Sequence, residues 1–297
     1  MDIDKYRVTE KNRAELAIFD HCEPGRDLSK KELSSLMKKN TKNISELQDK
    51  LYAEGKVGVL IIFQAMDAAG KDGAIKHVMS GVNPQGVNVT SFKQPSSREL
   101  SHDYLWRAVL ALPPRGKIAI FNRSYYEDVL IVKVHKLYEN QLLPDRVKNG
   151  DIINQRYKHI RDFEDYLWEN GILTVKFFLH LSKDEQHRRF LKRLDRKDKN
   201  WKFSHGDLKE RQYWDAYQEA YKTAIQETAT ERNPWYVVPA DKKAYTRAVI
   251  SEVLVDVMSA IGPSYPEVSD QQKADLAECK EQLVKEEEEI RGRNRID

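Results

Sequence analysis

The stretch GVLIIFQAMDAAGKDGAIKH, Gly58 to His77, decides the fold of this chain. It opens with an apolar run that ends at Phe63, and small residues then dominate from Ala65 to Gly73. A helix-like segment begins at Ala74. This order predicts a buried strand, a tight loop and a helix. In such a loop, backbone N–H groups and the N-terminus of the helix together form a binding site for an anion, of which phosphate is the obvious one.

The loop is similar to the phosphate-binding pattern G-x-x-x-x-G-K-[ST], from which it departs at two positions. Lys71 directly follows Gly70 and would place a compact cation on a bound phosphate. Ala65 replaces the first glycine, and Asp72 stands where the Mg²⁺-binding hydroxyl belongs. Asp67 compensates, because a carboxylate in this loop suits a site where it holds Mg²⁺ or orients an acceptor phosphate. The alternative is a glycine turn with a structural role alone.

The composition of the chain favours a local site for a polyanion over a generally polycationic protein. The chain has 297 residues, 40% of them hydrophobic, and its 50 basic and 47 acidic side chains give a net charge of +3. Positive charge must therefore be concentrated in one region if the chain binds a polyanion.

The sequence also predicts the cellular setting. Its first residues hold no apolar signal segment, and no run of about 18 apolar residues occurs. Cys22 and Cys279 lie far apart, and neither they nor the 8 histidines have metal-ligand spacing. We therefore expect a soluble, cytoplasmic protein with free thiols, no structural metal and no membrane partner.

Strands and helices alternate through the rest of the chain. Apolar runs predict further strands over residues 87–92, 117–121, 172–181 and 235–239. The alternation predicts a three-layer α/β/α domain of the P-loop kinase type, with a mostly parallel five-stranded sheet and a helical lid. We expect an N-terminal arm and a helix packed on the core over residues 1–55, this domain over residues 56–262, and a charged helical tail over residues 263–297.

Polar segments follow two of the predicted strands. NRSYYEDVL, Asn122 to Leu130, comes after the strand at 117–121. Arg123 offers a two-pronged guanidinium for phosphate oxygens, while Glu127 and Asp128 offer oxygens to a metal or to an acceptor nucleotide. Because such segments meet at the carboxyl edge of a parallel sheet, we expect this one beside the glycine loop. Lys93 and Arg98 follow the strand at 87–92 and face the same side, although either could equally be an isolated surface cation.

The most basic part of the chain is the segment from Lys183 to Arg211, which contains 11 basic and 6 acidic side chains. Such a concentration of charge is what a polyanion clamp needs. In phosphate-transferring kinases that this segment resembles, it forms a mobile lid whose closure excludes water. Arg189 and Arg193 lie four residues apart, on one face of a helix, and can close over phosphates together. A solvated surface helix with many ion pairs is the alternative.

The combination of AMDAAGKDG, Ala65 to Gly73, with FNRSYYEDVL, Phe121 to Leu130, resembles the polyphosphate kinase 2 family. The resemblance runs over roughly residues 6–261 and includes GVNPQGVNVTSFKQPS before the second motif and NWKFSHGDLKER after it. It implies an enzyme that reversibly moves the terminal phosphate of inorganic polyphosphate to AMP and ADP, giving ADP and ATP, with Mg²⁺ or Mn²⁺ as cofactor. The segment Asn122 to Glu127 looks like the subgroup that accepts both AMP and ADP, with guanine nucleotides left open. The resemblance also implies a homodimer or homotetramer.

The resemblance places the family's loop carboxylate on Asp67, its phosphate-binding lysine on Lys71 and its second-motif arginine on Arg123. With the residues discussed above, the predicted catalytic residues are Asp67, Lys71, Arg123, Glu127, Arg189 and Arg193. The predicted metal ligands are Asp67 and Glu127. The predicted phosphate- or nucleotide-binding residues are Ala68, Ala69, Gly70, Asp72, Gly73, Lys76, Lys93, Arg98, Asn122, Asp128, Arg188 and Lys202.

Two other functions are compatible with the same motifs. An ATP-dependent nucleoside monophosphate kinase of the thymidylate kinase type shares the P-loop and a basic lid, but its donor is ATP. A non-catalytic nucleotide-binding P-loop protein is the second alternative, against which stand the lid arginines and the absence of an N-K-x-D guanine-reading motif. No RNA- or DNA-reading motif occurs, so we expect no nucleic-acid partner.

Overall fold

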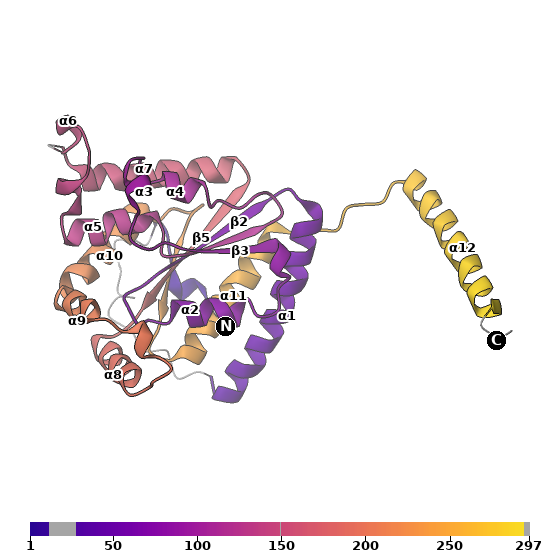
Figure 1. The fold of residues 1–297 in the computed structure, drawn as a ribbon, viewed down its shortest axis with the longest axis horizontal. Helices are drawn as coiled ribbons and strands as arrows, with labels where there is room; N and C mark the ends of the chain where they lie inside the picture. The colour runs from indigo at the N-terminus through magenta and orange to yellow at the C-terminus, as the bar shows by residue number, and fades with distance from the viewer. Residues whose placement is uncertain (12–27, 149, 294–297) are drawn as a thin grey trace. The chain divides into compact units, whose positions relative to one another are not determined.

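The computed structural model describes residues 1–11, 28–148 and 150–293, without the side chains of residues 202, 292 and 293. The chain divides into two compact units, Met1–Pro263 and Ser264–Asp297. The first unit contains the sheet and nearly all helices (Figure 1). Cys22 lies outside the described residues, and Cys279 is a free, exposed thiol.

A six-stranded sheet forms the centre of the first unit, in the order β1-β6-β5-β2-β4-β3. Its strands are β1 (Arg7–Val8), β2 (Gly58–Gln64), β3 (Val87–Ser91), β4 (Ile118–Asn122), β5 (Ile172–His180) and β6 (Trp235–Pro239). All neighbours are parallel except β1, which pairs antiparallel with β6. The predicted number of five strands is therefore one too low, because two residues of β1 are too few to show an alternating pattern.

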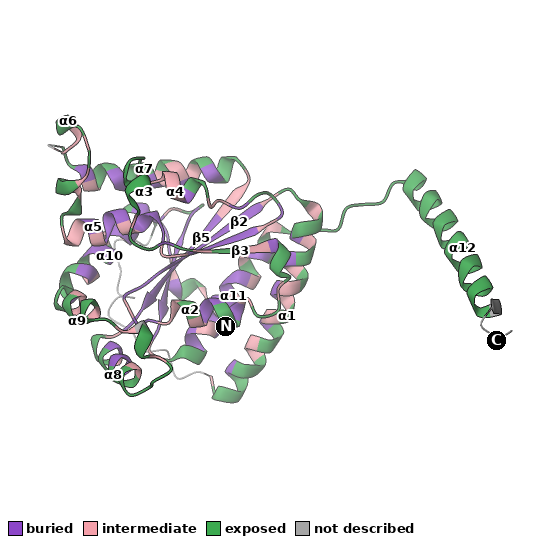
Figure 2. Ribbon diagram, viewed as in Figure 1, coloured by how far each residue is buried: buried purple, intermediate pink, exposed green. Residues whose placement is uncertain are grey.

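Helices cover both faces of the sheet, which confirms the predicted three-layer architecture. One face carries α1 (Lys30–Glu54), α2 (Lys71–Val78) and α11 (Lys243–Ile261), and the other carries α7 (Ile152–Glu169) and α10 (Trp214–Thr228). Successive side chains of β2 alternate between the two cores: Val59 and Ile61 pack with the first set of helices, Leu60 and Ile62 with the second. Every residue of β2 is buried, as Figure 2 shows for the strands at the centre.

Shorter elements connect these layers. The remaining α-helices of the first unit are α3 (Ser97–Leu100), α4 (Trp106–Val109), α5 (Ile131–Val134), α6 (Asp145–Lys148), α8 (Lys183–Leu194) and α9 (His205–Gln212). The 3₁₀ turns span Asp4–Tyr6, Pro84–Gly86, Tyr125–Val129, Leu137–Asn140 and Asn200–Lys202. The predicted lid thus comprises α8, a 3₁₀ turn and α9.

The second unit is the single helix α12 (Asp270–Arg293), whose described side chains are all exposed. Neither α12 nor any other described helix is both long and apolar enough to cross a membrane.

The topology places a crevice beside β2. The chain leaves β2 towards β3 and β4 on one side and later returns to β5 and β6 on its other side. In an open parallel sheet, ligands bind at the carboxyl ends of the strands where this reversal occurs. The glycine loop and the segment that begins at Asn122 both follow strands that end here.

Candidate active site

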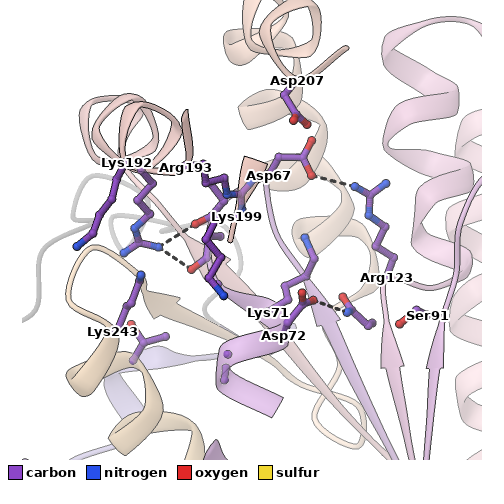
Figure 3. A pocket seen from close by; sticks show the side chains of 18 of the residues that line it. Asp67, Lys71, Asp72, Ser91, Arg123, Lys192, Arg193, Lys199, Asp207 and Lys243 are labelled. Carbon is purple, nitrogen blue, oxygen red and sulfur yellow. Dashed lines mark hydrogen bonds and ion pairs between the residues drawn. The ribbon is translucent and has the colours of Figure 1, made fainter. Parts of the chain in front are cut away.

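A pocket of about 810 Å³ opens at the carboxyl ends of β2, β3 and β4 (Figure 3). Its lining comprises residues 67–74, 91–94, 122 and 123, the α8 and lid residues Arg189, Lys192, Arg193, Arg196, Lys199, Trp201 and Asp207, and the α11 residues Lys243, Thr246 and Arg247. Ten of these side chains are cationic and only three are carboxylates. Since the whole chain carries only +3, its positive charge is concentrated at this site, as the composition requires of a polyanion-binding protein.

The loop between β2 and α2 has the backbone geometry of an anion site. Ala68 and Gly70 both have positive φ, 66° and 106°, and Gly70 is the N-cap of α2. The first N–H groups of a helix have no partner within the helix, and they carry the positive end of its dipole. The loop therefore presents donors and positive potential where the sequence predicts phosphate.

Lys71 reaches across this loop. Its ammonium donates to the carbonyl oxygen of Ala65 at 2.8 Å, and Figure 3 shows it pointing towards Asp67 and Arg123. Burial, and then the nearby positive charge of Arg123, lower the pKa of Lys71 to about 8. A phosphate in the loop would offer this ammonium a stronger acceptor than a carbonyl oxygen.

Arg123 lies between two carboxylates at the end of β4. Its Nη2 is 2.9 Å from Oδ1 of Asp67, and its Nη1 is 3.9 Å from Oε2 of Glu127. The φ of Arg123 is 64°, in the left-handed region, and its N–H donates to the carbonyl oxygen of Phe63 at 3.0 Å. The turn after β4 is therefore fixed to β2, which brings the second motif against the glycine loop as predicted.

A second link joins the same two segments. The amide of Asn122 donates to Oδ1 of Asp72 at 2.9 Å. Asp72, one of the two positions at which the loop departs from the phosphate-binding pattern, therefore contacts the residue that begins the second polar segment.

The carboxylates present fit a divalent cation that is held in part by its substrate. In the described part of the chain, no three His, Cys, Asp or Glu side chains converge as a metal site. Mg²⁺ is usually bound through one or two carboxylates together with substrate phosphates, so such a cluster is not required. Asp67 and Glu127, which flank one guanidinium, are the pair that could serve.

Most of the predicted site residues line this pocket. They are Asp67, Ala68, Ala69, Gly70, Lys71, Asp72, Gly73, Lys93, Asn122, Arg123, Arg189 and Arg193. Glu127 lies beside them through its ion pair with Arg123. The side chain of Lys202 is outside the described residues.

Four predicted ligand residues lie outside the pocket lining. Lys76 and Arg188 are both exposed. Neighbouring helix positions are about 100° apart, so Lys76 lies about 140° around α2 from Lys71 and on another face of the helix. Arg98 lies over the ring of Trp106, 5.6 Å from its centroid. Asp128 is buried against Arg156, at 3.5 Å, and burial raises its pKa to about 6.

Arg189 lines the pocket but differs from its predicted role. The side chain of Arg189 is only 7% exposed, and its guanidinium donates to backbone carbonyl oxygens of Ala68, Ala69 and Ala240. The i, i+4 spacing places Arg189 on the same helix face as Arg193. The spacing cannot show that backbone carbonyl oxygens already accept the hydrogen bonds of the Arg189 guanidinium.

Sequence reasoning missed the cations at the start of α11. Lys243 and Arg247 line the pocket together with Lys192, which sequence reasoning counted only as part of the basic segment. Lys192 and Lys243 lie on the same side of the pocket in Figure 3. Burial lowers the pKa of Lys243, and the positive charges of Arg189, Lys192 and Arg247 lower it further. A signal was available, since α11 follows the carboxyl end of β6 and therefore begins at the ligand edge of the sheet.

A lid carboxylate was also missed. Asp207 of α9 lies beside Asp67 in Figure 3. Burial raises the pKa of Asp207, and the negative charge of Asp67 raises it further. Two carboxylates from different parts of the chain thus approach each other above the glycine loop.

Comparisons with known proteins identify the family of this chain. The model of the family described as Polyphosphate kinase 2 (PPK2) matches residues 27–264. The ADP-polyphosphate phosphotransferase of Rhodopseudomonas palustris is 50% identical over 259 residues, which cover 86% of this chain and 90% of that protein. The AMP/ADP-polyphosphate phosphotransferase of Meiothermus ruber is 46% identical over 268 residues, covering 89% and 95%. The crystal structure of polyphosphate kinase 2 from Arthrobacter aurescens TC1 superposes with a TM-score of 0.84 at 39% identity, covering 94% of this chain and 96% of that one.

Proposed function

The chain belongs to the polyphosphate kinase 2 family and is a polyphosphate kinase, and we propose that its pocket moves the terminal phosphate of inorganic polyphosphate to AMP and ADP. The products are ADP and ATP, and the transfer is reversible. We infer both acceptors from the names of relatives, which are described as phosphotransferases acting on ADP, on AMP, or on both.

One observation supports polyphosphate, and not ATP, as the donor. Lys192, Lys243 and Arg247 all line the pocket, and burial followed by the positive charges of its neighbours lowers the pKa of Lys243. A chain of phosphates offers every one of them an oxyanion, whereas an adenosine group would need an apolar or aromatic surface there. We therefore place polyphosphate along these three side chains and the glycine loop, and the acceptor nucleotide near Arg123 and Lys93.

In this arrangement the side chains bind, align and neutralise phosphate groups. Lys71 exchanges its hydrogen bond with Ala65 for one to the transferred phosphate, and Arg123 donates to the equatorial oxygens on which charge develops. Asp67 and Glu127 would hold Mg²⁺, or Mn²⁺, which when bound neutralises further charge on the phosphate oxygens.

The reaction needs no strong general base. An ionised oxygen of the acceptor phosphate attacks the terminal phosphorus of polyphosphate, and the bridging P–O bond breaks as the shortened chain leaves with its electron pair. Most of the catalytic effect must then come from positioning and charge neutralisation, which the cationic pocket provides.

The test is transfer without ATP. Purified protein is mixed with Mg²⁺, polyphosphate and AMP, and ADP and ATP are followed over time. Lys71→Ala should abolish transfer, whereas Lys76→Ala, on the same helix but outside the pocket lining, should leave it unchanged. Activity with ATP and none with polyphosphate would identify an ordinary nucleoside monophosphate kinase, and phosphorylation of ADP alone would contradict the AMP assignment.

The cytoplasmic location and a homodimeric or homotetrameric assembly are further proposals that rest on the family resemblance. Light scattering of the purified chain measures its mass in solution, and a monomeric mass at assay concentrations would contradict the assembly. Cell fractionation tests the location. Guanine nucleotides are the second acceptor class to assay beside AMP and ADP.

A further inference from the structure

Helix α8 contacts three consecutive backbone carbonyls of the phosphate loop. Gln186 donates from Nε2 to the carbonyl oxygen of Asp67 at 3.0 Å. Arg189 donates from Nη1 to the carbonyl oxygens of Ala68 and Ala69, at 3.0 and 2.8 Å. Gln186 is 1% exposed and the Arg189 side chain 7%, so these bonds are shielded from water.

All five N–H donors of Arg189 have acceptors within the protein. Besides the two loop carbonyls, Nε donates to Oε1 of Glu185 at 2.8 Å, and Nη2 donates to the carbonyl oxygens of Ala240 and Asp241 at 2.6 and 3.1 Å. A guanidinium has five N–H groups, and here each has one partner. Arg189 could therefore bind a phosphate only by giving up one of these five bonds.

The direction of these carbonyls fixes the direction of the loop N–H groups. The C=O of one residue and the N–H of the next belong to one planar trans peptide and point in opposite directions. Holding the carbonyls of Asp67 and Ala69 against α8 therefore turns the N–H groups of Ala68 and Gly70 away from it. Ala68 also adopts a positive φ of 66°, which a residue with a Cβ avoids unless its surroundings impose it.

We propose that Gln186 and Arg189 are positioning residues that hold the phosphate loop in its anion-binding conformation, and that α8 is a fixed wall of the site and not a moving part of the lid. This inference rests on the proposed function, because it concerns how the same loop receives the phosphate donor. Two further contacts anchor α8: the N–H of Ser182, its N-cap, donates to Asp241 at 2.8 Å, and Phe190 is buried.

The role of geometry is separable from the role of charge. Arg189→Lys keeps the positive charge but cannot donate to four carbonyls in a fixed plane. Gln186→Met removes a neutral donor and changes no charge, although it also removes the acceptor of a 2.8 Å hydrogen bond from Arg211. If the loop needs these bonds, Arg189→Lys should raise KM for polyphosphate about tenfold or more, since a hydrogen bond from a charged group corresponds to at least that factor. Gln186→Met removes a bond between neutral groups and should raise this KM about three- to tenfold. KM for AMP should change less than about twofold, because the acceptor lies on the other side of the loop.

The controls separate the loss of these hydrogen bonds from the loss of a folded protein, and they measure binding of the phosphate chain without turnover. Arg115→Lys, exposed and bonded to the carbonyl of Asn170, tests the effect of an Arg-to-Lys change elsewhere. Thermal unfolding of each variant shows whether it is folded; if Arg189→Lys is not, Gln186→Met decides the question. Calorimetric binding of tripolyphosphate should weaken in parallel with KM, and millimolar guanidinium should partly restore binding to Arg189→Ala.

Two results would overturn the inference. Arg189→Lys with the donor KM of the parent protein would show that charge alone is needed at this position. Equal losses for donor and acceptor in both folded variants would show a general loosening of the site. Failure of the proposed function is recognised separately, because it appears in the parent protein as absence of transfer from polyphosphate; the variants would then be compared for binding of ATP phosphates by the same loop.

Discussion

At one end of the pocket Arg123 lies between the carboxylates of Asp67 and Glu127, whereas at the other end Lys243 faces Lys192 and Arg247. Among the described residues, no carboxylate is within ion-pair distance of these last three cations. The first end is arranged before any ligand arrives, because its charges hold one another in place. The second end carries mutual repulsion that a bound polyanion would relieve.

This difference assigns different tasks to the two ends. A preorganised group lowers the barrier of the transfer step, so its removal should reduce kcat. The cations at the second end contribute to binding of the polyanion. Their removal should therefore raise the KM for polyphosphate and make its binding less sensitive to salt. Substitutions at the two ends should therefore have separable kinetic effects.

Among the changes that distinguish the two ends of the pocket, the largest effect should follow from Arg123→Ala. Loss of the guanidinium removes the group that neutralises the transferred phosphate, and we expect kcat to fall about 10³-fold, as for loss of an arginine finger. The donor KM should change little, because the cations at the other end of the pocket remain. Steady-state kinetics with polyphosphate and AMP measures both constants, and a rise in donor KM with kcat preserved would contradict the division between the two ends.

A smaller effect, on the donor KM and not on kcat, should follow from the double substitution Lys243→Gln and Arg247→Gln. We expect the donor KM to rise about tenfold at low salt, with kcat within about twofold of the parent value. The variant should also lose part of the salt dependence of polyphosphate binding. Removing like charges that face one another should leave the melting temperature of the free protein equal or raised, and a clear fall would show that these cations are paired in the free state.

The smallest effect should be a pH dependence that originates in Lys71. Since its pKa is lowered to about 8, its ammonium is fully present below pH 8 and is lost as the pH rises through that value. Donor binding should weaken only severalfold over this range, because the other cations of the pocket remain charged. Calorimetry with tripolyphosphate from about pH 7 to 9.5 measures this, and affinity that stays constant to pH 9.5 would indicate an unshifted lysine.

The same shift has the opposite sign for stability. Between pH 8 and the ordinary lysine value of 10.5, the unfolded chain binds a proton at Lys71 that the folded chain does not. The contribution of Lys71 to stability therefore rises with pH over this interval. Thermal unfolding of the parent protein and of Lys71→Met across the interval isolates that contribution.

Local patterns were sufficient to predict the core of the site. The apolar run of β2 followed by small residues and Lys71 predicted the loop, and the polar segment from Asn122 predicted its neighbour, because both depend on the order of residues along the chain. The three layers follow from the alternation of strands and helices. These features are shared with the family, whose resemblance covers nearly the whole first unit.

Features that depend on pairs of residues distant in sequence could not be predicted in this way. Asp128 looks like an acceptor ligand until Arg156, 28 positions later, is found beside it. Arg189 looks like a free lid arginine until the loop carbonyls, 120 positions earlier, are seen to accept its hydrogen bonds. In both cases the chemical type of the side chain was clear, and what was missing was which partner the fold supplies.

The two-residue strand β1 has a practical consequence for handling this enzyme. It covers the outer edge of β6, and Tyr6 beside it shares a buried hydrogen bond of 2.6 Å with Tyr245. An uncovered edge strand pairs readily with other chains, which leads to aggregation. Affinity tags or truncations that displace the first eight residues would therefore threaten solubility before they affect catalysis, and the opposite terminus is the safer place for a fusion.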